Sequence, residues 1–260
     1  MIKTKLHRNE YDGVAWYTFK EIAELHFLKH WITSRQGGVS DGGYKGLNLG
    51  DHVGDADSNV SKNLKTVSSL FCEGRKIYLP NQVHSNRVAE ISSPGGKSRK
   101  DCDAVVVESR ETPIGVLTAD CLPVLIVDPH RKVAGVVHAG RMGVFMDIAG
   151  ETVRKLETLF GAKAREMIVA IGPGIRECCY EVGEDVFSGY ENYARYRNSA
   201  GRLDMVTAVA DSLSARGILN DNIFDCDICT SCKNDEFFSH RKQGLSGEKA
   251  GRFMTGLEIF

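Results

Sequence analysis

Four short apolar runs in the middle of the chain constrain its fold more than any other feature. They cover residues 104–107, 114–118, 122–127 and 133–137, and turn-forming residues separate them. Apolar runs of this length between turn residues are typical of strands that are buried on both faces. The sequence therefore predicts a sheet in the interior of the molecule, covered on both sides.

Helical periodicity surrounds these runs. Apolar residues recur every three or four positions from Val60 to Phe71, from Val144 to Phe160 and from Leu203 to Leu213. Gly161 and Gly217 stand where the last two helices would end. Shorter strands are predicted at residues 26–33 and 77–79.

Helices that mix with strands without strict alternation predict an α/β (α+β) fold, in which mixed β-sheets are flanked by helices. The sequence contains no repeat and no low-complexity stretch, and its most loop-like segment, residues 92–100, is too short to separate two domains. We therefore expect one domain over residues 1–260. A chain of this length, 42% hydrophobic and 26% charged, can bury a core without disulfides or a structural metal.

Charge and targeting features point away from several classes of protein. The net charge is −1 and the basic residues are scattered, whereas proteins that bind nucleic acids or membrane surfaces usually concentrate them. No apolar run approaches the roughly 18 residues of a membrane span, and no secretory signal is visible at the N-terminus. We expect a cytosolic protein whose eight cysteines are thiols or metal ligands.

Three polar residues stand where the predicted strands end. His84 follows the strand predicted at residues 77–79, Cys121 interrupts two buried strands, and His138 closes a third. Imidazole and thiolate are ligands that zinc prefers, and three protein ligands leave a fourth position for water, whose pKa zinc lowers. The same spacing also fits a Cys121–His138 nucleophile and base pair, as in cysteine hydrolases. Spacing leaves both interpretations open.

Longer motifs are more specific. Together they resemble the YfiH family, also called the laccase-domain or polyphenol-oxidase-like family, and they run in order from about residue 33 to the C-terminus. The motifs cover residues 33–40, 47–50, 81–84, 101–105, 118–124, 137–140, 171–174, 178–183 and 237–241.

The resemblance implies an α/β fold with mixed sheets, distantly similar to cysteine-hydrolase toxins, and a zinc centre at His84, Cys121 and His138. It further implies an enzyme of purine nucleosides, which phosphorolyses adenosine, inosine or methylthioadenosine and deaminates adenosine. Purine nucleoside and phosphate would be its substrates. The sequence sets no oligomeric state.

Within this interpretation we expect Arg35, Asp120 and Cys121 to take part in catalysis. The guanidinium of Arg35 suits phosphate because it can bind two oxygens at once, and Ser34 and Asn48 would add hydrogen bonds to the substrate. Asp120, beside the ligand cysteine, would orient a metal-bound histidine. Without the resemblance, surface or structural ion pairs would be the simpler interpretation of Arg35 and Asp120.

The sequence departs from the family pattern in places. The family usually continues His-Ala-Gly with Trp-Arg-Gly, whereas Arg141 and Met142 follow here, and Gly174 stands where many relatives have cysteine. A catalytically impaired protein that still binds nucleoside or metal is therefore one alternative. Copper-dependent oxidation of phenols is another, but it needs several copper sites with many histidines, and the eight histidines form no His-x-His pair.

Three further cysteines, Cys226, Cys229 and Cys232, are closely spaced. With one outside ligand they would suit a second zinc or an iron–sulfur cluster. Reduced thiols are the default expectation for such residues in the cytosol.

Overall fold

The computed structural model describes residues 1–93, 99–188 and 191–260. Its strands form two sheets, of seven and five strands. The seven-stranded sheet has the order β1 (Ile2–Lys3), β11 (Ile223–Asp225), β10 (Ile168–Ile171), β8 (Leu122–Asp128), β9 (Val133–Ala139), β6 (Ala104–Val107) and β5 (Val88–Glu90). The five-stranded sheet has the order β2 (His7–Tyr11), β3 (Val14–Thr18), β4 (Leu28–Thr33), β12 (Phe253–Ile259) and β7 (Ile114–Thr118).

Strand pairing in the larger sheet is mixed. The pairs β1–β11, β10–β11 and β5–β6 are parallel, whereas β8 pairs antiparallel with both β9 and β10. The α-helices are α1 (Lys20–Ala23), α2 (Asp57–Cys72), α3 (Arg141–Phe145), α4 (Ile148–Phe160), α5 (Glu184–Ser188), α6 (Met205–Ala215) and α7 (His240–Leu245). The predicted mixed α/β fold is confirmed. That residues 1–260 form one domain stays a prediction.

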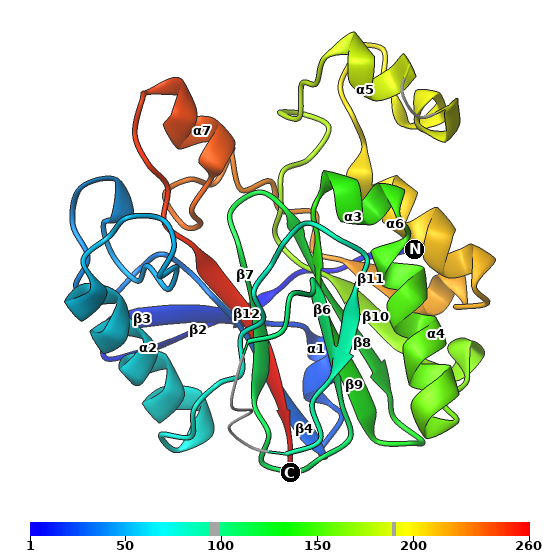
Figure 1. Ribbon diagram of the computed structural model, residues 1–260, viewed down its shortest axis with the longest axis horizontal. Helices are drawn as coiled ribbons and strands as arrows, with labels where there is room; N and C mark the ends of the chain where they lie inside the picture. The colour runs from blue at the N-terminus through cyan, green and yellow to red at the C-terminus, as the bar shows by residue number, and fades with distance from the viewer. Residues whose placement is uncertain (94–98, 189–190) are drawn as a thin grey trace.

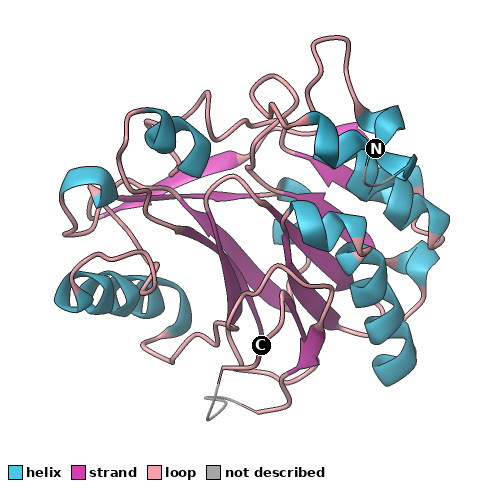
Figure 2. Cartoon of the chain, turned by 45° about the horizontal axis from the view of Figure 1, so that its top comes forward, coloured by secondary structure: helices cyan, strands magenta, loops and turns pink. Residues whose placement is uncertain are grey.

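The layers explain why the central strands are apolar throughout. Val105 and Val107 of β6 belong to the same buried cluster as Ile32 of the five-stranded sheet, whereas Ala104 and Val106 belong to a second cluster with residues of α4 and α6. Figures 1 and 2 show the strands as a central body with helices on both sides. Because side chains alternate between the two faces of a strand, burial on both faces requires an unbroken apolar run. The predicted burial on both faces is confirmed.

The helix α2 covers the outer face of the five-stranded sheet (Figure 1). Phe71 of this helix stacks on Trp31 of β4, with ring centroids 5.0 Å apart and an angle of 3° between the planes. Val67 joins them in the same buried cluster. The helix predicted between Val60 and Phe71 is confirmed, and its buried stripe is what holds it on the sheet.

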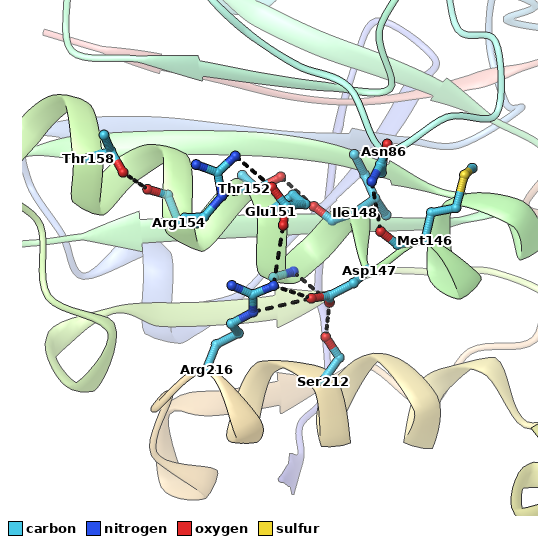
Figure 3. Close-up of polar contacts among 11 residues, drawn as sticks. Asn86, Met146, Asp147, Ile148, Glu151, Thr152, Arg154, Thr158, Ser212 and Arg216 are labelled. Atoms are coloured by element: carbon cyan, nitrogen blue, oxygen red, sulfur yellow. Dashed lines mark hydrogen bonds and ion pairs between the residues drawn. The ribbon is translucent and has the colours of Figure 1, made fainter. Parts of the chain in front are cut away.

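The single helix predicted from Val144 to Phe160 is two helices, α3 and α4. Asp147 separates them with a φ of 60°, and its side chain caps α4 by accepting a hydrogen bond from the Gly150 N–H. Figure 3 shows that Asp147 also accepts hydrogen bonds from Ser212 of α6 and from Arg216, the residue that follows this helix. Arg216 Nη2 donates to it at 2.8 Å. The break therefore lets one carboxylate join two helices.

Other predicted boundaries moved slightly. Strand β4 begins at Leu28, and α6 begins at Met205 because Asp204 caps it. The strand predicted at residues 77–79 is wrong, since only Tyr78 forms an isolated bridge, to Ile114. Part of the loop predicted at residues 92–100, namely 94–98, lies outside the described residues. None of the described helices has the length and apolar character needed to cross a membrane.

Candidate metal centre

The structure brings His84, Cys121 and His138 together. Their donor atoms all lie within 4.8 Å of one another, and Cys121 Sγ is 4.0 Å from His84 Nε2. The two imidazole rings meet nearly edge to face, with centroids 4.9 Å apart. His138 is buried and His84 is exposed, so the group is open on one side.

Strand pairing explains why Cys121 and His138 meet. Antiparallel pairing of β8 with β9 places Pro123 opposite His138, so residue 121 lies beside this end of β9. Cys121 precedes β8, where the chain has just crossed from β7 in the other sheet. At the crossing Asp120 has a φ of 89°, a conformation that only the surrounding structure can impose on a non-glycine residue.

The carboxylate of Asp120 holds that crossing in place. It accepts hydrogen bonds from Thr230 Oγ1 at 2.7 Å and from the backbone N–H of Arg241 at 2.6 Å, while its own carbonyl accepts from the Ile175 N–H. Asp120 therefore joins three segments at the mouth of the site. The prediction that Asp120 orients a histidine is wrong, because both carboxylate oxygens are bonded to these other groups.

Asp103 orients the histidine instead. Its buried Oδ1 lies 2.8 Å from His138 Nδ1 and accepts from the His84 N–H at 3.0 Å. Its Oδ2 accepts from the N–H and the hydroxyl of Ser85 at 2.6 and 2.8 Å. These bonds hold His84 at a φ of 58° and leave Nε2 of His138 facing Cys121. One carboxylate thus positions two of the three donors.

The charges of the site favour a thiolate. Burial opposes ionisation of Cys121 most strongly, but His138 and His84 outweigh it and lower the pKa of this thiol to about 6. Burial likewise opposes a charge on His138, yet Cys121 and Asp103 raise its pKa to about 9. These shifts favour a thiolate at Cys121 beside an imidazolium at His138, and a thiolate is the form that binds metal.

The donor set fits a zinc ion. At the usual Zn–S distance of about 2.3 Å and Zn–N distance of about 2.0–2.1 Å, two ligands of one ion lie at most about 4.4 Å apart. The 4.0 Å between Cys121 Sγ and His84 Nε2 lies within that reach. Gly140 leaves the space, because a Cβ there would lie 2.9 Å from His84 Cδ2 and 3.1 Å from Cys121 Sγ.

The three donors line a cavity of about 340 Å³, at the small end of the range for pockets that bind small molecules. Three arginines also line it: Arg141, Arg241 and Arg252. The guanidinium of Arg241 donates to the Glu181 carbonyl at 2.8 Å. Burial lowers the pKa of Arg252, whose Nη1 donates to two backbone carbonyls. The cavity therefore combines a thiolate and imidazoles with cationic groups.

The structure does not bring Ser34, Arg35 or Asn48 to this cavity. Arg35 donates to the Asn234 carbonyl at 2.7 Å and lies over the Phe238 ring, in a separate surface cleft. Ser34 accepts from a nearby backbone N–H. Asn48 Oδ1 accepts from the backbone N–H of Arg252 at 2.8 Å, so it reaches the site only by positioning a residue of the cavity wall.

The departure at residues 141–142 changes this wall. Arg141 lies on it, so an arginine occupies the position where the family usually has tryptophan. The sequence-based reasoning also missed Asp103, Arg241 and Arg252. The first two stood inside motifs singled out in the sequence, whereas Arg252 carried no signal because only the folded chain brings it to the cavity.

Among the clustered cysteines, the predicted grouping is wrong. Cys226 is buried in the core, where Arg176 Nη2 donates to its sulfur at 3.5 Å. Cys229 and Cys232 group instead with Cys178 and Cys179, and these four sulfurs lie within 4.8 Å of one another.

Two packed sheets, a mixed one of seven strands and an antiparallel one of five, with helices on their outer faces, define the class of fold. Comparison with known proteins gives the family: residues 29–259 match the model described as multi-copper polyphenol oxidoreductase laccase, and the chain belongs to this family. It also resembles solved structures. YlmD from Geobacillus stearothermophilus superposes with a TM-score of 0.87 at 25% identity, covering 98% of this chain and 99% of that one. The hypothetical protein YfiH from Bacillus licheniformis gives a TM-score of 0.85 at 25% identity, covering 97% and 99%.

Relatives in sequence have functional names. A purine nucleoside phosphorylase of Corynebacterium glutamicum is 33% identical over 228 residues, which are 85% of this chain and 91% of the relative. Another of Streptomyces coelicolor is 34% identical over 227 residues, 85% of this chain and 92% of the relative. The resemblance drawn from the motifs is confirmed at the level of the family.

Proposed function

We propose that this protein is a zinc-dependent purine nucleoside phosphorylase. The observation that carries the proposal is one cavity that joins a His–Cys–His donor set to three arginines, in a chain whose relatives are named for this reaction. The donors suit a metal, and the arginines suit the phosphate dianion. The predicted cytosolic location stays a prediction.

The reaction determines what the cavity must do. A phosphate oxygen bonds to C1′ of the ribose, the bond from C1′ to the purine nitrogen breaks, and its electron pair leaves with the base. Arg141, Arg241 and Arg252 would hold phosphate for this attack, and their charge would stabilise the charge that develops. Arg35, which the sequence pointed to for this role, lies in another cleft.

The departing base needs a hydrogen-bond donor or a proton. Tyr180 lines the cavity, and burial raises the pKa of its hydroxyl, so that group keeps its proton. Tyr180 would donate to the purine as negative charge builds on it. When bound by His84, Cys121 and His138, zinc would supply Lewis-acid chemistry to the same cavity. Adenosine deamination, also implied by the family resemblance, would use these residues and needs its own assay for ammonia.

A second candidate function rests on the charge state of the site. Cys121 as a thiolate beside the His138 imidazolium, with Asp103 behind the histidine, is the arrangement of a cysteine hydrolase. An alkylating reagent would abolish that activity and a chelator would leave it unchanged. A zinc-dependent phosphorylase would lose activity with the chelator and regain it with added zinc.

The first experiment is metal analysis joined to turnover. Two results together would support the proposal. The zinc content per chain should be lower in Cys121→Ala than in wild type, and free base should be released from inosine or adenosine only when phosphate is present. Release of base without phosphate, or turnover unaffected by removal of zinc, would refute it. Copper at more than one ion per chain, with oxidation of phenols, would favour the copper-dependent polyphenol oxidase reaction.

Arginine variants test the phosphate site. Loss of a charge-assisted hydrogen bond costs about 1.5–3 kcal/mol, so Arg241→Lys should raise the KM for phosphate about 10- to 100-fold. Arg154→Lys, an exposed change outside the lining of the cavity, is the control that should leave this KM unchanged. If Arg35→Lys raises the KM and Arg241→Lys does not, phosphate binds in the other cleft.

A further inference from the structure

Four cysteines outside the candidate centre converge on one point. Cys178, Cys179, Cys229 and Cys232 place all four sulfurs within 4.8 Å of one another. Cys179 Sγ is 3.4 Å from Cys232 Sγ, and Cys178 Sγ is 3.8 Å from the sulfurs of both Cys179 and Cys232. Two segments some fifty residues apart in sequence supply the group.

Backbone pairing holds the two segments together. Gly174 and Cys229 form an isolated parallel bridge, in which the Gly174 N–H donates to the Ile228 carbonyl and the Thr230 N–H donates to the Gly174 carbonyl. The buried Arg176 adds a second link, because its Nε donates to the Ile228 carbonyl at 3.1 Å. These hydrogen bonds hold the two cysteine-bearing segments side by side.

We propose that Cys178, Cys179, Cys229 and Cys232 form a second metal site that binds one soft divalent cation, with Zn²⁺ as the expected occupant. Four thiolates around one zinc make the closed tetrahedral arrangement of structural zinc sites. At a Zn–S distance of about 2.3 Å, the sulfurs of a regular tetrahedron lie about 3.8 Å apart. The separations of 3.4, 3.8 and 3.8 Å lie close to this value.

The spacing also favours a single ion over an iron–sulfur cluster. In a cluster the thiolates bind different irons around an inorganic core, so their sulfurs are held further apart than those of one tetrahedron. Entry of the cation displaces one proton from each of the four thiols, and no electron is transferred. Cys178 and Cys232 are exposed, which gives the ion access.

The proposed site adjoins the cavity wall. Tyr180, which follows Cys179, lines the cavity, and Thr230, which follows Cys229, donates to Asp120 beside Cys121. A cation bound by the four cysteines would hold both neighbours in position. We therefore assign it a structural role, in support of the cavity that the first site faces.

Elemental analysis of metal in single variants separates the two sites. Protein purified in reductant and zinc should carry about two zinc ions per chain, and Cys232→Ser and Cys121→Ser should each carry about one. Cys226→Ser is the matched control, because this cysteine is close in sequence but lies outside the cluster, and it should keep two. If Cys232→Ser does not fold, Cys178→Ser is used in its place, because it removes another exposed ligand.

A spectroscopic test in the Cys121→Ser background makes the result independent of activity. Added Co²⁺ should give the intense sulfur-to-cobalt charge-transfer absorption of a tetrathiolate, and a further Cys232→Ser change should abolish it. One zinc in wild type that Cys121→Ser removes entirely would overturn the second site and leave the first intact. A cluster without metal, in a chain whose mass is two hydrogens lower until reductant is added, would identify a disulfide. That result would also overturn the second metal site. Two zinc ions in Cys232→Ser would refute the assignment of ligands.

Discussion

Replacement of Asp103 by asparagine should weaken the metal centre while changing its shape little. The carboxylate accepts from the N–H groups of His84 and Ser85, from the Ser85 hydroxyl and from His138 Nδ1. Because asparagine keeps one oxygen, that oxygen will remain toward Ser85, where two strong donors converge. The new NH₂ group then faces His84 and His138.

Two costs follow from that orientation. The part-buried N–H of His84 loses its acceptor, which costs about 1 kcal/mol of folding free energy. The Nδ1 atom of His138 must accept instead of donate, so its proton moves to Nε2, the atom that faces Cys121. A protonated Nε2 cannot bind metal, and changes to such supporting residues cost about 10- to 100-fold in metal affinity.

The assay is zinc affinity by competition with a chromophoric chelator, together with urea unfolding of the metal-free protein. Asp101→Asn is the matched control, since this exposed carboxylate lies two residues earlier and accepts from Asn81 at 2.7 Å. Asp103→Asn should lower zinc affinity at least tenfold and Asp101→Asn should not. Equal affinities for the two variants would show that Asp103 does not set the tautomer of His138.

Three other predictions concern a buried histidine and two closely packed glycines. Burial lowers the pKa of His30 to about 4, below its value in the unfolded chain, so the protein takes up a proton when it unfolds at acid pH. The free energy of unfolding should therefore fall by up to about 3 kcal/mol between pH 6.5 and 4. Urea unfolding of His30→Gln should show a shallower dependence on pH. Gly140→Ala should lower zinc affinity about tenfold because its Cβ would push two ligands apart. Gly244→Ala is the control, since among the described residues no atom would lie within 4 Å of its Cβ, and it should leave the affinity unchanged. Equal zinc affinity in the two variants would contradict the packing at Gly140. Gly256→Ala should lower the free energy of unfolding by about 1–3 kcal/mol, since its Cβ would meet Trp31 Cζ2 at 2.5 Å. Thermal unfolding measures the effect, and an unchanged melting temperature would refute that contact.

The sequence could predict the elements whose burial is simple. The strands β6 to β9 are apolar on both faces because helices cover one side and a second sheet covers the other. The helix α2 has a clear buried stripe that ends at Phe71 and Cys72. Such patterns depend only on neighbouring residues, so they can be seen before the chain is folded.

The strand β12 shows where local patterns fail. It is fully buried and lies between β4 and β7, but it was missed because it contains Gly256 and Glu258. Arg75, which lies 183 residues earlier in the sequence, donates from Nε to the buried carboxylate of Glu258 at 2.9 Å. The glycine makes room for Trp31. Both residues make sense in a strand only once their partners are known.

The sequence alone determined the donor types at His84, Cys121 and His138 and the apolar strands that carry two of them. Tertiary structure decided what surrounds those donors: Asp103 came behind His138 in place of Asp120, and arginines from distant segments entered the cavity while Arg35 stayed outside. It also joined Cys178 and Cys179 to Cys229 and Cys232 in place of Cys226. The reason is physical, since the identity of a donor is a local property of the chain, whereas its partners depend on how strands from different parts of the sequence pair and cross.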